Sequence, residues 1–207
     1  MNVYVLDVAP LAGRESEALA VLSPERRTKA GRICRTDARL RSIGAGLLLR
    51  MAGLTDGIRF GKFGKPYLPG GPEFSLTHSG SFAALAVNDA PVGLDIETIA
   101  PVRRASERVL TPEEREYMAA DPERRFAYLW TRKEAVLKCT GAGLSKPMNA
   151  FSALDESAEL EGARYSLFSA PLKNAVLSAA VRGDDAAFAP QFVSLHELFA
   201  VRTEERA

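Results

Sequence analysis

Cysteine and histidine are scarce in this sequence, with two of each among its 207 residues. Cys34 and Cys139 can provide neither a disulfide framework nor the clustered ligands of a structural zinc site. No uncharged apolar run approaches the ~18 residues that a membrane-spanning helix needs. The N-terminal MNVYVLDV has no basic region, and Asp7 interrupts its apolar run, so a signal peptide is not expected. These absences predict a cytoplasmic protein that does not act on membranes.

Several common site motifs are missing as well. The sequence has no GxxxxGK[ST] loop, no GxGxxG after a predicted strand and no GxSxG elbow. P-loop, dinucleotide-binding and serine-hydrolase sites are therefore poorly supported. Two histidines leave little room for an acid–base dyad, and Cys139, with its apolar neighbours, is expected to fill core space.

Charge is nearly balanced overall, at +1, but it is unevenly distributed. Residues 24–65 contain eleven Lys or Arg and three acids, a local excess of eight positive charges, so the rest of the chain carries an excess of seven negative charges. One region is thus suited to an anion and the other to a cation. A nucleic-acid-binding module could use the basic region, but it would lack interleaved aromatics and leave the acids described below unexplained.

A repeat with an offset of 88 residues runs through the chain. VLDV at 5–8 corresponds to GLDI at 93–96, and VLSPERR at 21–27 corresponds to VLTPEER at 109–115. The tetrapeptide GAGL also recurs, at 44–47 and 141–144. We predict two similar halves, 1–90 and 91–207, which meet at the turn 88–91.

Each half is expected to begin with a short strand and to continue with helices. Ser23-Pro24 and Thr111-Pro112 are helix start signals, and Glu114 completes a capping box. A long amphipathic helix should then run to a stop at each GAG. Strands should follow, at FSLTHSGSFAALAV in the first half and at FSALDE, ARYSLFSA and AVLSAAVR in the second. FVSLHELF suggests a short closing element. This mixture predicts an α+β fold.

Two acids interrupt the apolar strand PVGLDIETIAP. Asp95 and Glu97 share one face of such a strand, opposite Leu94 and Ile96, and they repel each other unless a cation or proton lies between them. On the helix WTRKEAVLK, Glu134 and Lys138 are four residues apart, hence on one face. Three carboxylates without Cys or His ligands suit Mg²⁺. The alternative is a surface Glu134–Lys138 pair, with the two strand acids facing solvent.

Four basic residues could bind phosphate groups: Arg26, Lys29, Arg41 and Lys65. Lys65 stands in a loop rich in Gly and Pro, where the backbone can approach an anion closely. His78 follows a predicted strand in the same region. The alternatives are a solvated basic helix face and a structural histidine.

Four segments in order resemble the 4′-phosphopantetheinyl transferase superfamily, specifically its larger, surfactin-synthetase-activating type: GKP at 64–66, FSLTHSG at 74–80, VGLDIE at 92–97 and WTRKEAVLKCTGAGL at 130–144. The basic helix and FVSLHEL are also similar. The resemblance implies two α/β subdomains in a pseudo-twofold arrangement within one chain, with the active site between them. It also implies a monomer.

The resemblance implies roles for individual residues. Asp95, Glu97 and Glu134 match magnesium-binding acids, and Lys138 matches the lysine beside the coenzyme A pyrophosphate. Other matched positions hold coenzyme A: Lys65 and His78 its phosphates, Arg26, Lys29 and Arg41 its 3′-phosphate, and the backbone of Ser79 its nucleotide.

The implied reaction transfers 4′-phosphopantetheine from coenzyme A to a serine of an apo acyl or peptidyl carrier protein and releases 3′,5′-ADP. Glu134 and Lys138 are the expected catalytic residues, with Glu134 or a metal-bound water as the base. A non-catalytic coenzyme A- or carrier-binding protein on the same fold is the alternative.

Overall fold

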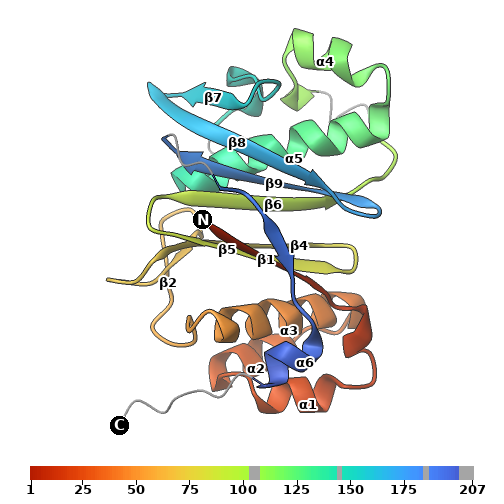
Figure 1. Ribbon diagram of the computed structural model, residues 1–207, viewed down its shortest axis with the longest axis vertical. Helices are drawn as coiled ribbons and strands as arrows, with labels where there is room; N and C mark the ends of the chain where they lie inside the picture. The colour runs from red at the N-terminus through yellow and green to blue at the C-terminus, as the bar shows by residue number, and fades with distance from the viewer. Residues whose placement is uncertain (103–107, 144–145, 184–186, 201–207) are drawn as a thin grey trace.

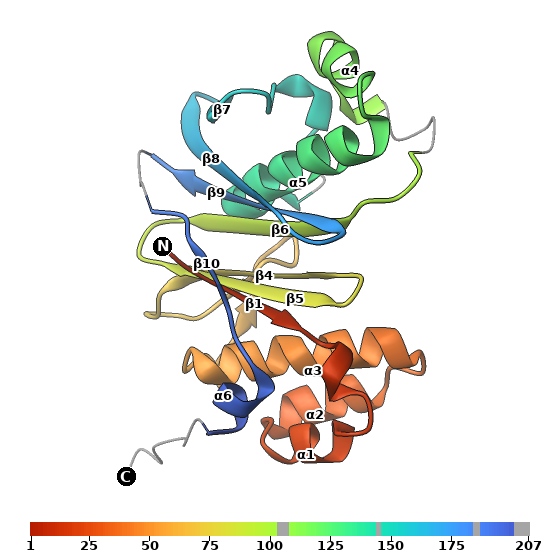
Figure 2. The same cartoon turned by 45° about the vertical axis from the view of Figure 1, so that its right-hand side comes forward.

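The computed structural model describes residues 1–102, 108–143, 146–183 and 187–200, and it consists of four layers (Figure 1). Two four-stranded sheets lie between two long helices, α3 (Thr36–Met51) and α5 (Pro122–Thr140). The predicted α+β fold is confirmed. Shorter helices lie outside these layers (Figure 2): α1 (Glu15–Ala20) and α2 (Pro24–Gly31) beyond α3, and α4 (Pro112–Met118) beyond α5. In the described ranges, no helix combines the length and apolar character that crossing a membrane requires.

The same pairing order occurs in both sheets. In the first, β1 (Asn2–Asp7) and β4 (Glu73–Ser79) both pair antiparallel with β5 (Phe82–Asn88). In the second, β6 (Val92–Thr98) and β8 (Ala163–Pro171) both pair antiparallel with β9 (Ala175–Arg182), and β7 (Ser157–Leu160) extends the sheet beyond β8. A separate two-stranded hairpin is formed by β2 (Arg59–Phe60) and β3 (Pro66–Tyr67).

The last described segment returns to the first sheet. Strand β10 (Pro190–Phe192) pairs parallel with β1, and α6 (Leu195–Ala200) buries Leu195 and Leu198 in the core around α3. Arg50 of α3 donates a hydrogen bond to the carbonyl of Leu198 at 3.0 Å. The division into 1–90 and 91–207 remains a proposal. Residues 190–200 come late in the chain but pack against β1 and α3, which belong to the first of these two halves.

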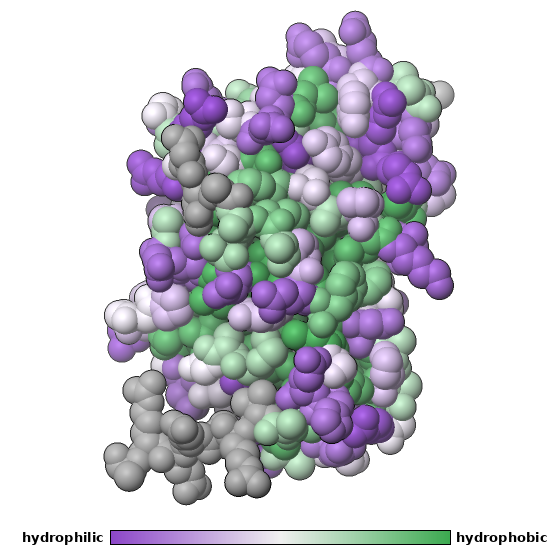
Figure 3. All heavy atoms as spheres, in the orientation of Figure 1, coloured by the Kyte–Doolittle hydropathy of each residue, from purple (hydrophilic) through white to green (hydrophobic). Residues whose placement is uncertain are grey.

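Apolar side chains fill the spaces between the layers. Strand alternation sends Val3, Val5, Leu94 and Ile96 into the core between the two sheets, as expected for Leu94 and Ile96. The opposite faces of the sheets are covered by the helices, which bury residues such as Leu47 of α3 and Ala135 of α5. On the face shown in Figure 3, apolar surface gathers over the sheets in the middle of the molecule.

The start signals are confirmed and one of the two stops is wrong. Ser23 and Thr111 are the N-caps of α2 and α4, and Gly141 ends α5 with a φ of 71°. Helix α3, however, continues through Gly44 and Gly46 to Met51. A Cβ atom at Gly44 would lie 2.5 Å from Cγ1 of Val8, so this glycine permits close packing of the helix instead of ending it.

The predicted strand at 151–156 is also wrong, because buried cations hold this segment in an irregular path. Lys133 donates to the carbonyl of Phe151, and Arg132 donates to the carbonyls of Ala153 and Asp155. These carbonyls are therefore unavailable for a strand ladder. The strand begins at Ser157.

Candidate active site

Helix α5 lies directly on strand β6, and Gly93 permits this contact. A Cβ atom at Gly93 would lie 1.9 Å from the carbonyl oxygen of Ala135, so no other residue fits without moving the helix. Asp95 and Glu97 share the face of Gly93 and therefore lie under the same helix. The contact brings Glu134 and Lys138 to these two acids.

Asp95 is buried, with 6% of its surface exposed. Its Oδ1 atom accepts hydrogen bonds from Lys138 Nζ at 2.5 Å and from Thr77 Oγ1 at 3.1 Å. Its Oδ2 atom is buried and has no partner in the described part of the protein. Burial raises the pKa of Asp95, and the charge of Lys138 opposes this rise. One oxygen of this carboxylate is thus satisfied and the other is not.

Glu97 and Glu134 are partly buried beside Asp95. Glu97 Oε1 accepts a hydrogen bond from Ser79 Oγ at 3.0 Å. Burial raises the pKa of Glu97, and the negative charge of Asp95 adds to the effect. Burial likewise raises the pKa of Glu134, with further contributions from Asp95 and Glu97 and an opposing one from Lys138. The three carboxylates therefore form one electrostatic cluster.

Lys138 is the cation of this cluster. Besides its ion pair with Asp95, its Nζ atom donates to Thr77 Oγ1 at 3.3 Å and to the carbonyl of Leu94 at 3.2 Å. One ammonium group faces three carboxylates, so the cluster has an excess of negative charge when all are ionised. Such an excess favours binding of a further cation.

The donor set fits a magnesium ion that is shared with a substrate. In residues 1–102, 108–143, 146–183 and 187–200, no three Asp, Glu, His or Cys side chains are arranged as a ready metal site. Mg²⁺ commonly takes only one or two carboxylates and completes its shell with water and phosphate oxygens. The unpartnered Oδ2 of Asp95 and the neighbouring acids supply oxygen ligands of this kind.

Lys65 approaches the same region from the hairpin loop. Its Nζ atom donates to the carbonyls of Val92 and Cys139, both at 3.2 Å, and lies 3.5 Å from a carboxylate oxygen of Glu73. A cavity of about 430 Å³ opens here, lined among others by Phe63, Lys65, Ser75, Glu134 and Lys138. The structure thus brings the ammonium group of Lys65 to the C-terminal end of α5, in the cavity that Glu134 and Lys138 also line.

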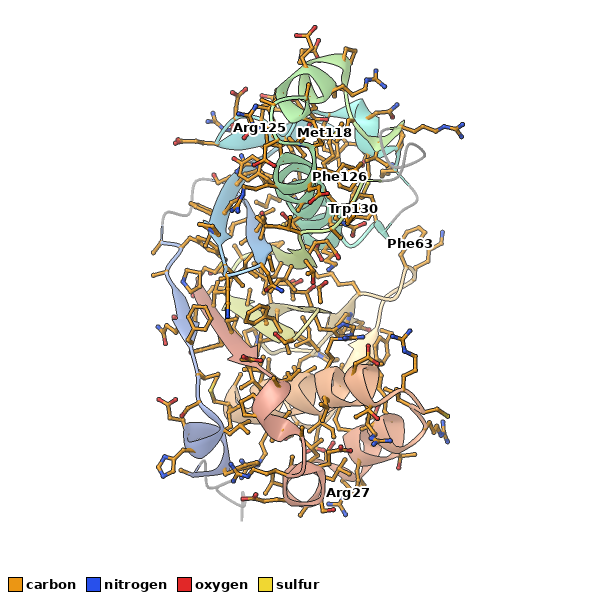
Figure 4. All side chains as sticks on the ribbon, turned by 90° about the vertical axis from the view of Figure 1, so that its right-hand side faces the viewer. Arg27, Phe63, Met118, Arg125, Phe126 and Trp130 are labelled. Carbon is orange, nitrogen blue, oxygen red and sulfur yellow. The ribbon has the colours of Figure 1, made fainter. Side chains whose placement is uncertain are left out.

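A second hollow of about 270 Å³ lies beside Glu97. The rings of Phe126 and Trp130 on α5 stack with centroids 5.8 Å apart and form part of its wall. Figure 4 shows these two side chains on α5 and Phe63 on the hairpin loop. Glu97 is therefore flanked by an apolar surface.

The other predicted basic residues divide into two groups. Partial burial lowers the pKa of His78. The positive charges of Arg41, Lys138 and Lys29 lower it further. Arg41 also donates to the carbonyl of Gly80 at 3.0 Å, next to Ser79. Arg26 instead turns toward α3 and donates to the carbonyl of Ser42 at 2.9 Å. The charges of Lys29 and Arg41 thus both act on His78, whereas Arg26 is engaged with the backbone of α3.

A buried ion pair behind the site escaped the sequence analysis. Lys133 Nζ lies 2.9 Å from Glu114 Oε2, and neither side chain is exposed to solvent. Glu114 also accepts hydrogen bonds from the backbone N–H groups of Thr111 and Ala153. The capping box signalled the first of these bonds, but nothing in the local pattern distinguished Lys133 from an exposed lysine. This pair fixes α4 and residues 148–153 against α5.

Comparisons with known proteins identify the family of the chain. Residues 91–190 match the family model of the 4′-phosphopantetheinyl transferase superfamily. A 4′-phosphopantetheinyl transferase of Bacillus subtilis is 35% identical over 169 residues, which cover 73% of this chain and 75% of the relative. The 4′-phosphopantetheinyl transferase Sfp of Bacillus subtilis strain 168 is 31% identical over 170 residues, with the same coverage. HetI of Nostoc is 33% identical over 189 residues, which cover 79% of this chain and 80% of the relative. The chain therefore belongs to the 4′-phosphopantetheinyl transferase superfamily and is a transferase.

Proposed function

We propose that this enzyme transfers 4′-phosphopantetheine from coenzyme A to a serine hydroxyl of an apo acyl or peptidyl carrier protein in a magnesium-dependent reaction. The observation that carries the proposal is the meeting of Lys138 with Asp95, Glu97 and Glu134 beside the cavity that contains Lys65. The names of the relatives support the group that is transferred.

The basic residues are assigned to the two anionic parts of coenzyme A. Lys65 and Lys138 line one cavity, so we assign both to the pyrophosphate. We assign Lys29, Arg41 and His78 to the 3′-phosphate because the positive charges of Arg41 and Lys29 both act on His78. The backbone of Ser79 lies next to this group, between His78 and the Gly80 carbonyl that Arg41 contacts, and we propose that the nucleotide passes it.

We propose that Arg26 acts indirectly in coenzyme A binding, without contacting the 3′-phosphate itself. Its guanidinium is engaged with Ser42, and burial lowers its pKa. We propose that Arg26 supports the 3′-phosphate site by holding α2 against α3, which positions Lys29 on α2.

Asp95, Glu97 and Glu134 would hold Mg²⁺, which when bound neutralises negative charge on the pyrophosphate. Lys138 adds a fixed ammonium group at the same place. Its bonds to Thr77 and to the Leu94 carbonyl orient it before substrate arrives, so little reorganisation is needed as charge develops on the leaving phosphate.

In the proposed step, the serine oxygen of the carrier forms a bond to the β-phosphorus of coenzyme A. The bond from that phosphorus to the bridging oxygen breaks, and 3′,5′-ADP leaves. Glu134 takes the serine proton. In the metal-free protein, burial and the nearby charges of Asp95 and Glu97 raise the pKa of Glu134, so its carboxylate has an affinity for a proton above that of an exposed glutamate before the cation binds. Because all of these groups belong to one chain, we propose that the monomer is active.

The test is covalent labelling of a carrier. Purified enzyme, fluorescent coenzyme A and Mg²⁺ should label an apo carrier protein, and a variant carrier without the acceptor serine should remain unlabelled. Glu134→Gln should abolish the label, whereas Glu159→Gln, which changes an exposed carboxylate on β7, should leave it unchanged. Failure of the wild-type enzyme to label any of several fatty-acid, polyketide and peptide-synthetase carriers would contradict the proposal.

A further inference from the structure

A row of hydroxyl groups joins the two sheets beside the site. Strands β4 and β6 are edge strands of different sheets, and alternate side chains of β4 reach the backbone of β6. The oxygens of Ser75, Thr77 and Ser79 accept hydrogen bonds from the N–H groups of Leu94, Ile96 and Thr98, at 2.9, 3.4 and 3.2 Å respectively. These three bonds stand where a backbone ladder would otherwise be.

Each hydroxyl has a single proton to donate. Because the oxygen of Thr77 accepts from Ile96, its proton is available to Asp95 Oδ1, which lies 3.1 Å away. In the same way Ser79 accepts from Thr98 and donates to Glu97 Oε1 at 3.0 Å. The backbone bonds favour donation from each hydroxyl to its carboxylate, and at Ser79 the hydroxyl of Thr98, 3.0 Å away, is a further partner in which either oxygen can donate.

Thr77 has a further contact that fills its capacity. Lys138 Nζ donates to Thr77 Oγ1 at 3.3 Å, so the oxygen accepts two hydrogen bonds and donates one. These bonds engage Oδ1 of Asp95 and leave its buried Oδ2 unpartnered among the described residues. The bond from Thr77 to Oδ1 thus leaves Oδ2 of Asp95 as the oxygen that can bind a ligand.

Ser75 is a matched position without this effect. It makes the same kind of bond, to the N–H of Leu94, but the neighbouring residue on the site face of β6 is Gly93, which has no side chain. The row therefore contains two hydroxyls that orient a carboxylate and one that does not.

We propose that Thr77 and Ser79 are positioning residues, which orient Asp95 and Glu97 respectively for a divalent cation. The inference rests on the proposed function, since it assigns the two acids to cation binding. Under this assignment, side chains of β4 in the first sheet orient the acids of β6 in the second sheet.

The experiment measures Mn²⁺ binding directly, by the loss of the free-ion signal in electron paramagnetic resonance, on the full chain without substrate. Thr77→Val and Ser79→Ala should each weaken binding about 10-fold or more, as loss of a group that orients a metal ligand commonly does. Thr77→Ser and Ser79→Thr keep the hydroxyl and should restore affinity to near the wild-type value. Ser75→Ala loses one bond of the row and should bind Mn²⁺ like the wild type.

A second readout separates positioning from general damage. In the labelling assay, Thr77→Val and Ser79→Ala should raise the Mg²⁺ concentration for half-maximal rate, while the KM for coenzyme A at saturating Mg²⁺ changes little. Urea unfolding should give similar stability losses for Ser75→Ala and Ser79→Ala. If Thr77→Val does not fold, the test is the comparison of Mn²⁺ affinity between Ser79→Ala and Ser75→Ala.

The outcomes distinguish two failures. A wild-type enzyme that binds no Mn²⁺ would overturn the metal assignment and this inference with it. If the wild type binds Mn²⁺ and Ser79→Ala binds it as tightly as Ser75→Ala does, the positioning role is overturned and the proposed function stands.

Discussion

The ammonium group of Lys138 lies 2.5 Å from a carboxylate oxygen of Asp95, and this ion pair connects the last turns of α5 to the middle of β6. The lysine side chain retains 32% exposure, whereas that of Asp95 retains only 8%. The buried acid therefore depends on a cation that is still open to the cavity. Under the proposed function, a substrate phosphate in the cavity would meet the exposed side of the same ammonium group.

Lys138→Gln should reduce the labelling rate about 10²–10³-fold, the usual effect of removing one group that stabilises transition-state charge. The substitution also leaves Asp95 without its charge partner, so the pKa of Asp95 should rise further. The measurement is single-turnover labelling of an apo carrier. Lys173→Gln, at an exposed lysine after β8, is the matched control and should label at the wild-type rate.

Without a divalent cation, the carboxylate cluster should make the protein less stable as pH rises from about 4 toward neutrality. Burial raises the pKa values of Asp95, Glu97 and Glu134. A group whose pKa is raised on folding binds its proton more tightly in the folded state, so its contribution to stability falls as pH rises above the unfolded pKa.

The comparison that isolates this effect is wild type against Glu134→Gln, by urea unfolding in EDTA at several pH values. The variant should lose less stability between pH 4.5 and 7.5, and added Mg²⁺ at pH 7.5 should stabilise the wild type more than the variant. Parallel pH profiles for the two proteins would contradict the assignment of Glu134 to the cluster.

Gly93→Ala should destabilise the protein by at least the ~1–3 kcal/mol that is typical of overpacking. The added Cβ would lie 1.9 Å from a backbone oxygen of α5, and backbone atoms yield less readily than side chains. Labelling should fall too, because any shift of α5 moves Glu134 and Lys138. Gly31→Ala, at a position with no atom within 4 Å of the new Cβ, should leave unfolding nearly unchanged.

Lys29→Ala and Arg26→Ala should have different effects although both residues lie on α2. Lys29→Ala should weaken coenzyme A about 10–100-fold, the value of a hydrogen bond to a charged group, and should affect dephospho-coenzyme A little. Arg26→Ala should mainly lower the free energy of unfolding, since its guanidinium joins α2 to the Ser42 carbonyl. Equal losses of both nucleotides in Lys29→Ala would contradict a 3′-phosphate role.

Lys133→Met should cost about 3–5 kcal/mol of unfolding free energy, because it leaves the fully buried carboxylate of Glu114 without its cation. An exposed pair offers the contrast. Lys146 pairs with Glu161, whose side chain is 60% exposed, and Lys146→Met should cost no more than about 1 kcal/mol. Urea unfolding of the two variants measures both values.

The parts of the structure that local sequence encodes were predictable. Ser23 and Thr111 cap their helices through their own side chains, and Gly141 ends α5 because it adopts a left-handed conformation. The shared face of Asp95 and Glu97 follows from strand alternation alone. Each of these features depends on residues only a few positions apart.

The parts that depend on distant contacts were not predictable. Gly44 is a residue type that commonly ends helices, but here it lies inside α3, where the absence of a side chain allows close contact with Val8. Residues 151–156 read as a strand, but buried Lys133 and Arg132 claim their carbonyls. The sequence identifies Thr77 and Ser79 as polar residues of a predicted strand. Their contacts with Asp95 and Glu97 depend on the packing of two sheet edges, which the sequence does not predict.

The pairing of β10 with β1 also has a consequence for solubility. Along β1, residues from Val3 to Val5 use both edges of the strand, one toward β5 and one toward β10. Truncation before Pro190 would expose a row of unpaired backbone groups on a strand with buried valines on its inner face. Such an edge can pair with a second molecule, so the shortened protein should aggregate even though every proposed active-site residue is retained.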